Sequence, residues 1–253
     1  MDLEDAVAPG RKAEARAALT EAVPAVARGG DAVVRINRPL DLAVADIDAA
    51  VAAGVGALVL TKLMGPEHLR LLEEVVEAAE ARHGRAPGAV RLIGLVETLS
   101  AVPLLGAIAA ASPRLVALGA GREDLAAELE AEPGTLPLQQ IAIGTLMAAR
   151  AAGILPLGSL APFVGLEDLE AYRAGLRRSR AMGFACASCI HPAQVAVINE
   201  EYGARPEEVE RARRLVLAFE TALAAGRGAV AFEGAMVDLP VVEQARALLR
   251  RAR

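Results

Sequence analysis

The chain has 253 residues, 54% of them hydrophobic and 2% aromatic, and its formal net charge at pH 7 is -5. Mild acidity without tryptophan argues against a nucleic-acid or anionic-membrane partner, since these call for a basic face or for aromatic stacking platforms. No run of about 18 uncharged apolar residues predicts a membrane span, and the acidic start MDLEDAV is unlike a signal peptide. The two cysteines indicate a reducing cytoplasm rather than a disulfide scaffold.

Apolar segments of strand length alternate with helical segments, which is the pattern of a parallel sheet covered by helices. Their hydrophobic residues run almost without interruption, as is typical of strands covered on both faces. Six strands are predicted, at 32–37, 57–62, 90–97, 115–121, 154–160 and 185–190.

Helices are predicted between and after these strands from apolar residues that recur at helical spacing. The predicted ranges are 41–54, 67–84, 137–153, 166–183, 192–203 and 206–226, with a last helix from Pro240. Residues 229–238 favour a short hairpin that turns at Glu233-Gly234. This tail lies outside the alternation of strands and helices and is interpreted as an appended arm or lid.

The cysteines form the motif 186-CASC-189 inside the last predicted strand. Residues three apart on a strand point to opposite faces, so Cys186 and Cys189 are not expected to meet. A structural zinc site would need two more soft ligands. The motif is therefore interpreted as two buried, small apolar residues.

Charged residues lie where several predicted strands end, namely Arg35, Lys62, Glu97 and, shortly after its strand, Asp124. The carboxyl ends of parallel strands open onto one face of an α/β barrel, where such a cluster could hold a hard divalent ion and a carboxylate substrate. The alternative is that each is simply where the chain meets water. For Lys62, a salt-bridged lysine and a Schiff-base nucleophile are both open.

Several strings of the chain, taken in order, resemble the citrate lyase β-subunit-like branch of the HpcH/HpaI aldolase superfamily, the CoA-ester lyases. The strings are LEDAV at 3–7, VVRIN at 33–37, VLTK at 59–62, LVET at 95–98, GRED at 121–124, CIHPAQ at 189–194 and EGAMVDLPVVEQA at 233–245. The resemblance implies a (β/α)₈ TIM barrel over residues 1–203 and a C-terminal helical arm over 204–253. It also implies a cytoplasmic homotrimer or hexamer, by analogy only.

The activity implied by the resemblance is Mg²⁺-dependent cleavage of a carboxylated 3-hydroxyacyl-CoA of the malyl, citramalyl or citryl type. Carbon–carbon cleavage would release an acyl-CoA and a 2-oxo acid. By the same resemblance Glu97 and Asp124 bind the metal, Arg35 and Glu97 contact substrate, and Asp238 matches an aspartate of the C-terminal arm that reaches the active site of a neighbouring subunit. Cleavage leaves a thioester enolate that an acid must protonate at carbon, and Asp238 is the candidate for this acid. Glu4 and Asp5 match acids of the metal's outer surroundings, or else belong to a helix N-terminus that favours negative charge.

The resemblance leaves two questions open. Relatives place a strand, a helix and most of a second strand before LEDAV, so the chain is expected to lack these elements of the eight-stranded barrel. The competing functions are a thioesterase on the same CoA thioesters, a Schiff-base aldolase acting through Lys62, and a non-catalytic subunit of a larger assembly.

Overall fold

The computed structural model describes residues 1–132, 134–160 and 168–252 of the chain. They form two compact units, Met1–Gln194 and Val195–Arg253, and the helix α9 (Pro192–Tyr202) contains the boundary. Within the described ranges, no helix is long and apolar enough to cross a membrane.

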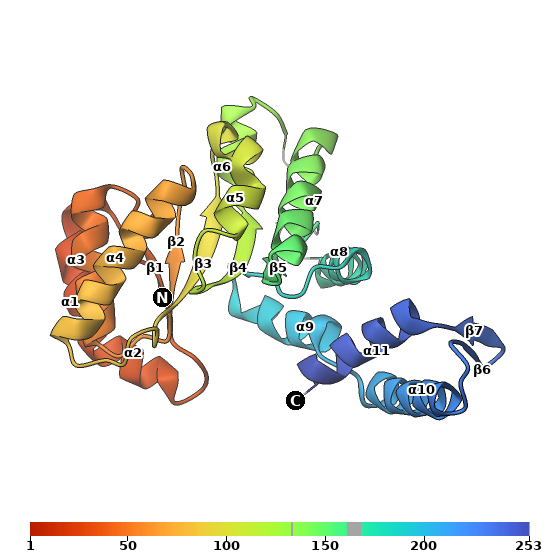
Figure 1. The fold of residues 1–253 in the computed structure, drawn as a ribbon. Helices are drawn as coiled ribbons and strands as arrows, with labels where there is room; N and C mark the ends of the chain where they lie inside the picture. Colours follow the sequence, from red (N-terminus) through yellow and green to blue (C-terminus); the bar gives the residue numbers. More distant parts are fainter. Residues whose placement is uncertain (133, 161–167, 253) are drawn as a thin grey trace. The chain divides into compact units, whose positions relative to one another are not determined.

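The first unit is built on a five-stranded sheet whose strands all run parallel, in the order β1-β2-β3-β4-β5 (Figure 1). The strands are β1 (Val33–Ile36), β2 (Ala57–Leu60), β3 (Arg91–Val96), β4 (Leu115–Ala120) and β5 (Leu155–Leu157). Each begins within one residue of its predicted start. The α/β architecture with a parallel sheet is therefore confirmed.

Single bridges extend the sheet at both edges. Asp2 pairs with Arg35 of β1, and Cys186 pairs with Leu157 of β5, both in parallel orientation. The strand predicted at 185–190 is thus reduced to one bridge, because its neighbour β5 ends at Leu157. No pairing among the described residues joins the two edges, so the closed barrel stays a prediction.

Helices follow the strands along the chain. They are α1 (Lys12–Ala17), α2 (Leu19–Ala27), α3 (Leu40–Ala52), α4 (Pro66–Arg82), α5 (Leu105–Ala109), α6 (Arg122–Glu128), α7 (Leu136–Ala151) and α8 (Leu169–Met182), with 3₁₀ turns at Pro9–Arg11 and Leu99–Leu104. The helices predicted at 41–54, 67–84 and 137–153 are confirmed, as is 166–183 apart from residues 166–167, which lie outside the described residues. The short helices α1, α2, α5 and α6 were not predicted. Pro24 interrupts the helical pattern in α2, and Pro103 does so just before α5. The helices α1 and α6 have only six and seven residues, too few for the apolar spacing of a helix to repeat.

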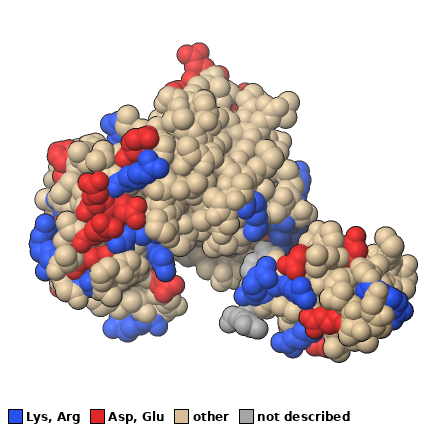
Figure 2. Space-filling view, viewed as in Figure 1, with Lys and Arg blue, Asp and Glu red and all other residues tan. Residues whose placement is uncertain are grey.

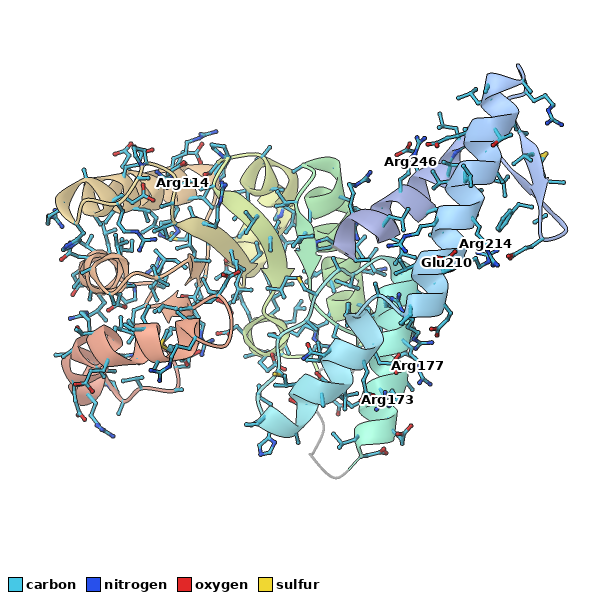
Figure 3. The ribbon with its side chains drawn as sticks, turned by 90° about the horizontal axis from the view of Figure 1, so that it is seen from below. Arg114, Arg173, Arg177, Glu210, Arg214 and Arg246 are labelled. Carbon is cyan, nitrogen blue, oxygen red and sulfur yellow. The ribbon has the colours of Figure 1, made fainter. Side chains whose placement is uncertain are left out.

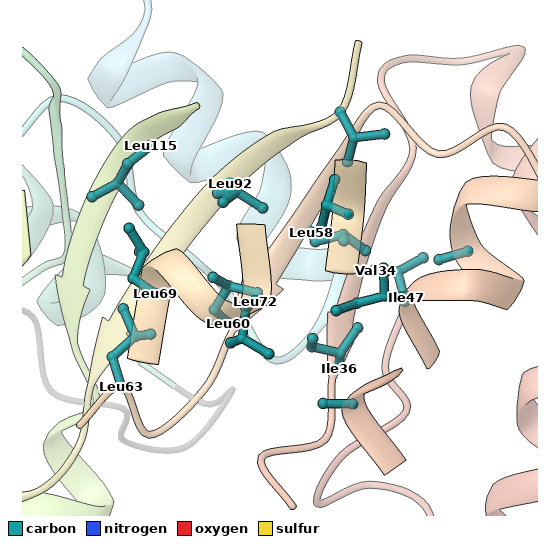
Figure 4. Close-up of a cluster of buried hydrophobic side chains, with 14 of the residues drawn as sticks. Val34, Ile36, Ile47, Leu58, Leu60, Leu63, Leu69, Leu72, Leu92 and Leu115 are labelled. Atoms are coloured by element: carbon teal, nitrogen blue, oxygen red, sulfur yellow. The ribbon is translucent and has the colours of Figure 1, made fainter. Parts of the chain in front are cut away.

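One face of the sheet is buried under the helices (Figure 4). Val34, Ile36, Leu58, Leu60 and Leu92 point to this face and pack with apolar residues of α3 and α4 in a single core cluster, including Ile47, Leu69 and Leu72. Burying each such side chain contributes roughly 1.5–3 kcal/mol to stability.

The opposite face of the sheet is half-buried along parts of β1, β2 and β3. Arg35, Val59 and Ile93 pair across β1, β2 and β3 and share this face, and Leu95 follows on it. The expectation that the strands are covered on both faces is therefore met only in part. These residues are half-buried, whereas Ala117 and Gly119 of β4, which pair with Ile93 and Leu95 on the same face, are buried.

A buried ion pair joins α4 to the start of β4. Arg114, labelled in Figure 3, donates to both carboxylate oxygens of Glu80 at 2.9 and 2.8 Å. Glu80 also accepts the backbone N–H groups of Gly88 and Val90. All the polar groups of this pair are thus satisfied inside the protein.

The second unit contains α10 (Pro206–Ala224), the hairpin strands β6 (Val230–Phe232) and β7 (Ala235–Val237), and α11 (Leu239–Arg251). It has its own core, in which Leu215 and Phe219 of α10 pack with Val242 of α11. Glu233 and Gly234 both have positive φ, so the predicted hairpin turn is confirmed. Glu233 also binds Arg211 and Arg214, the latter labelled in Figure 3.

Candidate active site

Four charged residues lie at the carboxyl edge of the sheet in the first unit. Arg35 belongs to β1, Lys62 and Glu97 follow the ends of β2 and β3, and Asp124 lies in the first turn of α6, just after β4. Parallel strands with matched register bring these positions to one edge. The predicted cluster is therefore present.

Arg35 is held by two carboxylates from the N-terminal segment. Its Nε and Nη2 donate to the two oxygens of Asp2 at 2.8 and 2.6 Å, and its Nη1 lies 3.0 Å from Glu4 Oε2. The hydrogen bond to Asp2 raises the pKa of Arg35. Burial acts to raise the pKa of Asp2, but the Arg35 hydrogen bond and charge lower it overall. The guanidinium is thereby fixed in orientation.

Lys62 reaches three carboxylates. Its Nζ lies 2.8 Å from Glu4 Oε1, 3.4 Å from Asp124 Oδ1 and 3.7 Å from Asp5 Oδ2. Burial opposes the charged ammonium, but the hydrogen bond to Glu4 and the nearby carboxylates raise the pKa of Lys62 overall. Of the alternatives for Lys62, the salt-bridged lysine is the one found, and Glu4 joins Lys62 to Arg35.

Glu97 is 5% exposed, and its Oε2 accepts the backbone N–H of Lys62 at 2.6 Å. Lys62 has a positive φ of 49°, a rare conformation for a residue with a side chain. Gly121 leaves room for the carboxylate, since a Cβ there would lie only 2.5 Å from Glu97 Cγ. Burial raises the pKa of Glu97 to about 7, with Asp124 and Glu4 adding to the rise and the Lys62 N–H opposing it.

A cavity of about 180 Å³ opens beside this cluster on the half-buried face of the sheet. Its lining includes Arg35, Glu97, Gly119, Arg122 and Ser159. The walls thus combine carboxylate, guanidinium and hydroxyl groups, which suits a small anionic molecule.

The acids at this cavity fit a divalent cation. Glu97 is buried beside the like charge of Asp124, and among the described residues only its Oε2 accepts a hydrogen bond. The described ranges hold no group of three or more His, Cys, Asp or Glu placed to bind a metal. Mg²⁺ is commonly held by one or two carboxylates while waters and substrate complete its octahedron, so Glu97 and Asp124 could hold it.

The structure brings together six of the seven predicted site residues: Glu4, Asp5, Arg35, Lys62, Glu97 and Asp124. The seventh, Asp238, belongs to the second unit, where it directly precedes α11 with no side-chain capping bond.

Two features of the site were not predicted from the sequence. Asp2 was overlooked although it is two residues from Glu4, the spacing that puts side chains on one side of an extended chain. The need for glycine at position 121 depends on contact with Glu97, for which a sequence offers no signal.

The two cysteines are free and half-buried. Their predicted separation without a disulfide is confirmed, whereas their full burial is not, because the segment around them makes only one bridge to the sheet.

Comparisons with known proteins show which family the chain is similar to. The model of the HpcH/HpaI aldolase/citrate lyase family matches residues 1–192. The chain is 32% identical to a citrate lyase subunit beta from Leuconostoc mesenteroides, over 99% of this chain and 84% of that one. It is 31% identical to an L-malyl-CoA/beta-methylmalyl-CoA lyase from Cereibacter sphaeroides, over 100% of this chain and 86% of that one.

A solved structure is also similar over the whole chain. It is the protein CitE from Mycobacterium tuberculosis in complex with magnesium, acetoacetate and coenzyme A. The TM-score is 0.74 and the identity 32%, covering 100% of this chain and 88% of that one.

Proposed function

Because the chain belongs to the HpcH/HpaI aldolase/citrate lyase family, we propose that it is a Mg²⁺-dependent carbon–carbon lyase acting on CoA esters. The substrate is a carboxylated 3-hydroxyacyl-CoA of the malyl, citramalyl or citryl type, and the products are an acyl-CoA and a 2-oxo acid. The observation that carries the proposal is the buried Glu97 facing Asp124 beside a cavity that Arg35 lines.

Glu97 and Asp124 would hold the Mg²⁺, which supplies Lewis acidity toward the oxygens of the 2-oxo acid. Arg35 presents a planar, permanently charged guanidinium to the same cavity, where it attracts the carboxylate of the substrate. Asp2 and Glu4 fix this guanidinium, so its direction is set before substrate arrives. These residues thus bind and orient the acid half of the substrate.

Asp238 is proposed as the group that protonates the carbon of the thioester enolate after cleavage, and that removes this proton in the reverse direction. It precedes α11 and is half-buried. Its side chain makes no capping bond, so the carboxyl group is not committed to holding the helix.

The competing functions fare differently. A Schiff-base aldolase needs a lysine with a lowered pKa, whereas the pKa of Lys62 is raised by its carboxylate partners, so this alternative is not favoured. A thioesterase on the same thioesters would use the same charged cavity and remains the second candidate. Titratable groups with a shifted pKa in a cavity are typical of active sites. The raised pKa of Glu97 therefore favours an enzyme over a non-catalytic subunit.

The proposal extends to the assembly and location of the protein. We propose a closed barrel and a homotrimer or hexamer in a reducing cytoplasm. An oligomer is supported by the surface over α5, α6 and α7, which is largely without charge in Figure 2. Leu104, Leu136 and Met147 are exposed in this region. The two free cysteines fit a reducing compartment.

A turnover assay with malyl-CoA, citramalyl-CoA and citryl-CoA, in Mg²⁺ and in EDTA, tests the activity. The lyase releases a 2-oxo acid only with Mg²⁺ and releases no free thiol. Free thiol without oxo acid would instead identify the thioesterase. Glu97→Ala and Asp124→Ala should each abolish both activity and metal dependence, and an unchanged rate in either variant would overturn the metal assignment.

A further inference from the structure

Lys62 contacts the acidic cluster through two different groups. Its backbone N–H binds Glu97, while its ammonium lies within 4 Å of Glu4, Asp5 and Asp124. The positive φ of Lys62 aims the N–H at Glu97 independently of the side chain. Replacing the side chain therefore leaves the backbone bond to Glu97 in place.

The ammonium balances the charge of Asp124 and shares Glu4 with Arg35. Within the described part of the chain, Asp124 makes its only ion pair with Lys62, while Arg35 pairs with Asp2 and Glu4. Without the ammonium, Asp124 would repel the buried Glu97, whose pKa its charge already raises. Lys62 thus occupies the position of a counter-cation between the two carboxylates proposed to bind metal and the N-terminal acids.

We propose that Lys62 is a positioning residue with two opposed effects: it holds the acidic cluster together while no metal is bound, and it weakens the binding of Mg²⁺ to Glu97 and Asp124. This inference rests on the proposed Mg²⁺ site. The physical reason is that an ammonium in contact with one metal ligand repels a divalent cation bound to the same carboxylate. A purely structural lysine would instead support both the fold and the metal site.

The two effects are separable by measuring the thermal unfolding midpoint without metal and the Kd for Mg²⁺ by calorimetry. Lys62→Met removes the charge and keeps most of the side-chain length, and Lys62→Arg keeps the charge. The matched control is Lys12→Met, because Lys12, the other lysine of the chain, donates to the backbone carbonyls of Leu3 and Glu4 and pairs with no described carboxylate. The titrations are run at about pH 8, above the pKa of Glu97.

Lys62→Met is expected to lower the unfolding midpoint of the metal-free protein and to bind Mg²⁺ about tenfold more tightly, from the Coulomb interaction of the two cations. Lys62→Arg restores both values toward wild type, and Lys12→Met leaves the Kd unchanged. If wild type binds Mg²⁺ and Lys62→Met binds it no more tightly, the role of Lys62 is overturned while the proposed function stands. Mg²⁺ binding by Lys62→Met alone would support the role of Lys62 and count against the proposed cofactor. Absence of binding in both would overturn both.

Discussion

At the scale of single residues, the site depends on a carboxylate that the fold keeps away from water. Glu97 is buried next to the charges of Asp124 and Glu4, and its side chain accepts, from the residues that the structure describes, one hydrogen bond, which the Lys62 backbone donates. Its ionised form is therefore disfavoured until a cation binds. This destabilises the folded state at neutral pH and leaves a carboxylate suited to the metal-binding role proposed for it.

The pH dependence of stability follows from the raised pKa of Glu97. Between its ordinary pKa of 4.5 and about 7, the unfolded chain loses this proton while the folded protein keeps it. The free energy of unfolding of the metal-free protein should therefore fall as pH rises through this window, by up to about 3 kcal/mol. Denaturant titrations from pH 4.5 to 8 measure this fall.

Glu97→Gln should make this pH dependence shallower and raise the free energy of unfolding at pH 8 without metal. The control is Glu21→Gln, since Glu21 is an exposed carboxylate of α2. An unaltered slope in Glu97→Gln would show that Glu97 is ionised at low cost.

At the scale of elements, the buried pair of Arg114 and Glu80 ties α4 to the start of β4. It lies at the amino end of β4, whereas the charged cluster follows the carboxyl ends of the strands. Sequence reasoning did not pair these residues, because they are 34 positions apart and each alone looks like an ordinary surface charge.

Arg114→Met should lower the free energy of unfolding by about 3–5 kcal/mol, because it leaves the Glu80 carboxylate buried without its cation. Chemical denaturation measures the loss. The matched control is Arg82→Met, since Arg82 lies on α4, the helix that also carries Glu80. Its exposed ion pair with Asp48 should contribute less than about 1 kcal/mol. Equal losses in the two variants would contradict the importance of the buried pair.

At the scale of the whole molecule, the chain consists of two units, and the proposed acid Asp238 lies in a different unit from Glu97. The resemblance implies that this arm serves the active site of a neighbouring subunit. The prediction can be tested because the proposed metal ligand Glu97 and the proposed acid Asp238 lie in different units and can be replaced separately.

Asp238→Asn alone should lower kcat by at least about a hundredfold without altering the Kd for Mg²⁺. Co-expression of Asp238→Asn with Glu97→Ala chains should restore about a quarter of the wild-type activity, since random mixing gives that share of sites an intact residue from each neighbour. No recovery in the mixed oligomer would mean that Asp238 acts within its own chain or not at all. Full activity of Asp238→Asn would remove it from the mechanism.

By itself, the sequence determined where most of the regular elements lie. Runs of apolar residues marked β1 to β5, helical spacing marked α3, α4 and α7, and Glu233-Gly234 marked the hairpin turn, since these signals act over neighbouring residues. The sequence also placed Arg35, Lys62, Glu97 and Asp124 at one edge, because parallel strands end together.

Only the tertiary structure decided how these charges pair. Residues distant in the chain meet in the paired hydrogen bonds between Arg35 and Asp2 and in the contacts of the Lys62 ammonium with Glu4 and Asp124. The close approach of Glu97 to Gly121 is likewise a contact between separate segments. The burial that raises the pKa of Glu97 likewise depends on what packs around it. The interaction energy between two charges falls with the distance between them and with their exposure to water. Both the distances and the exposures are set only when the chain folds.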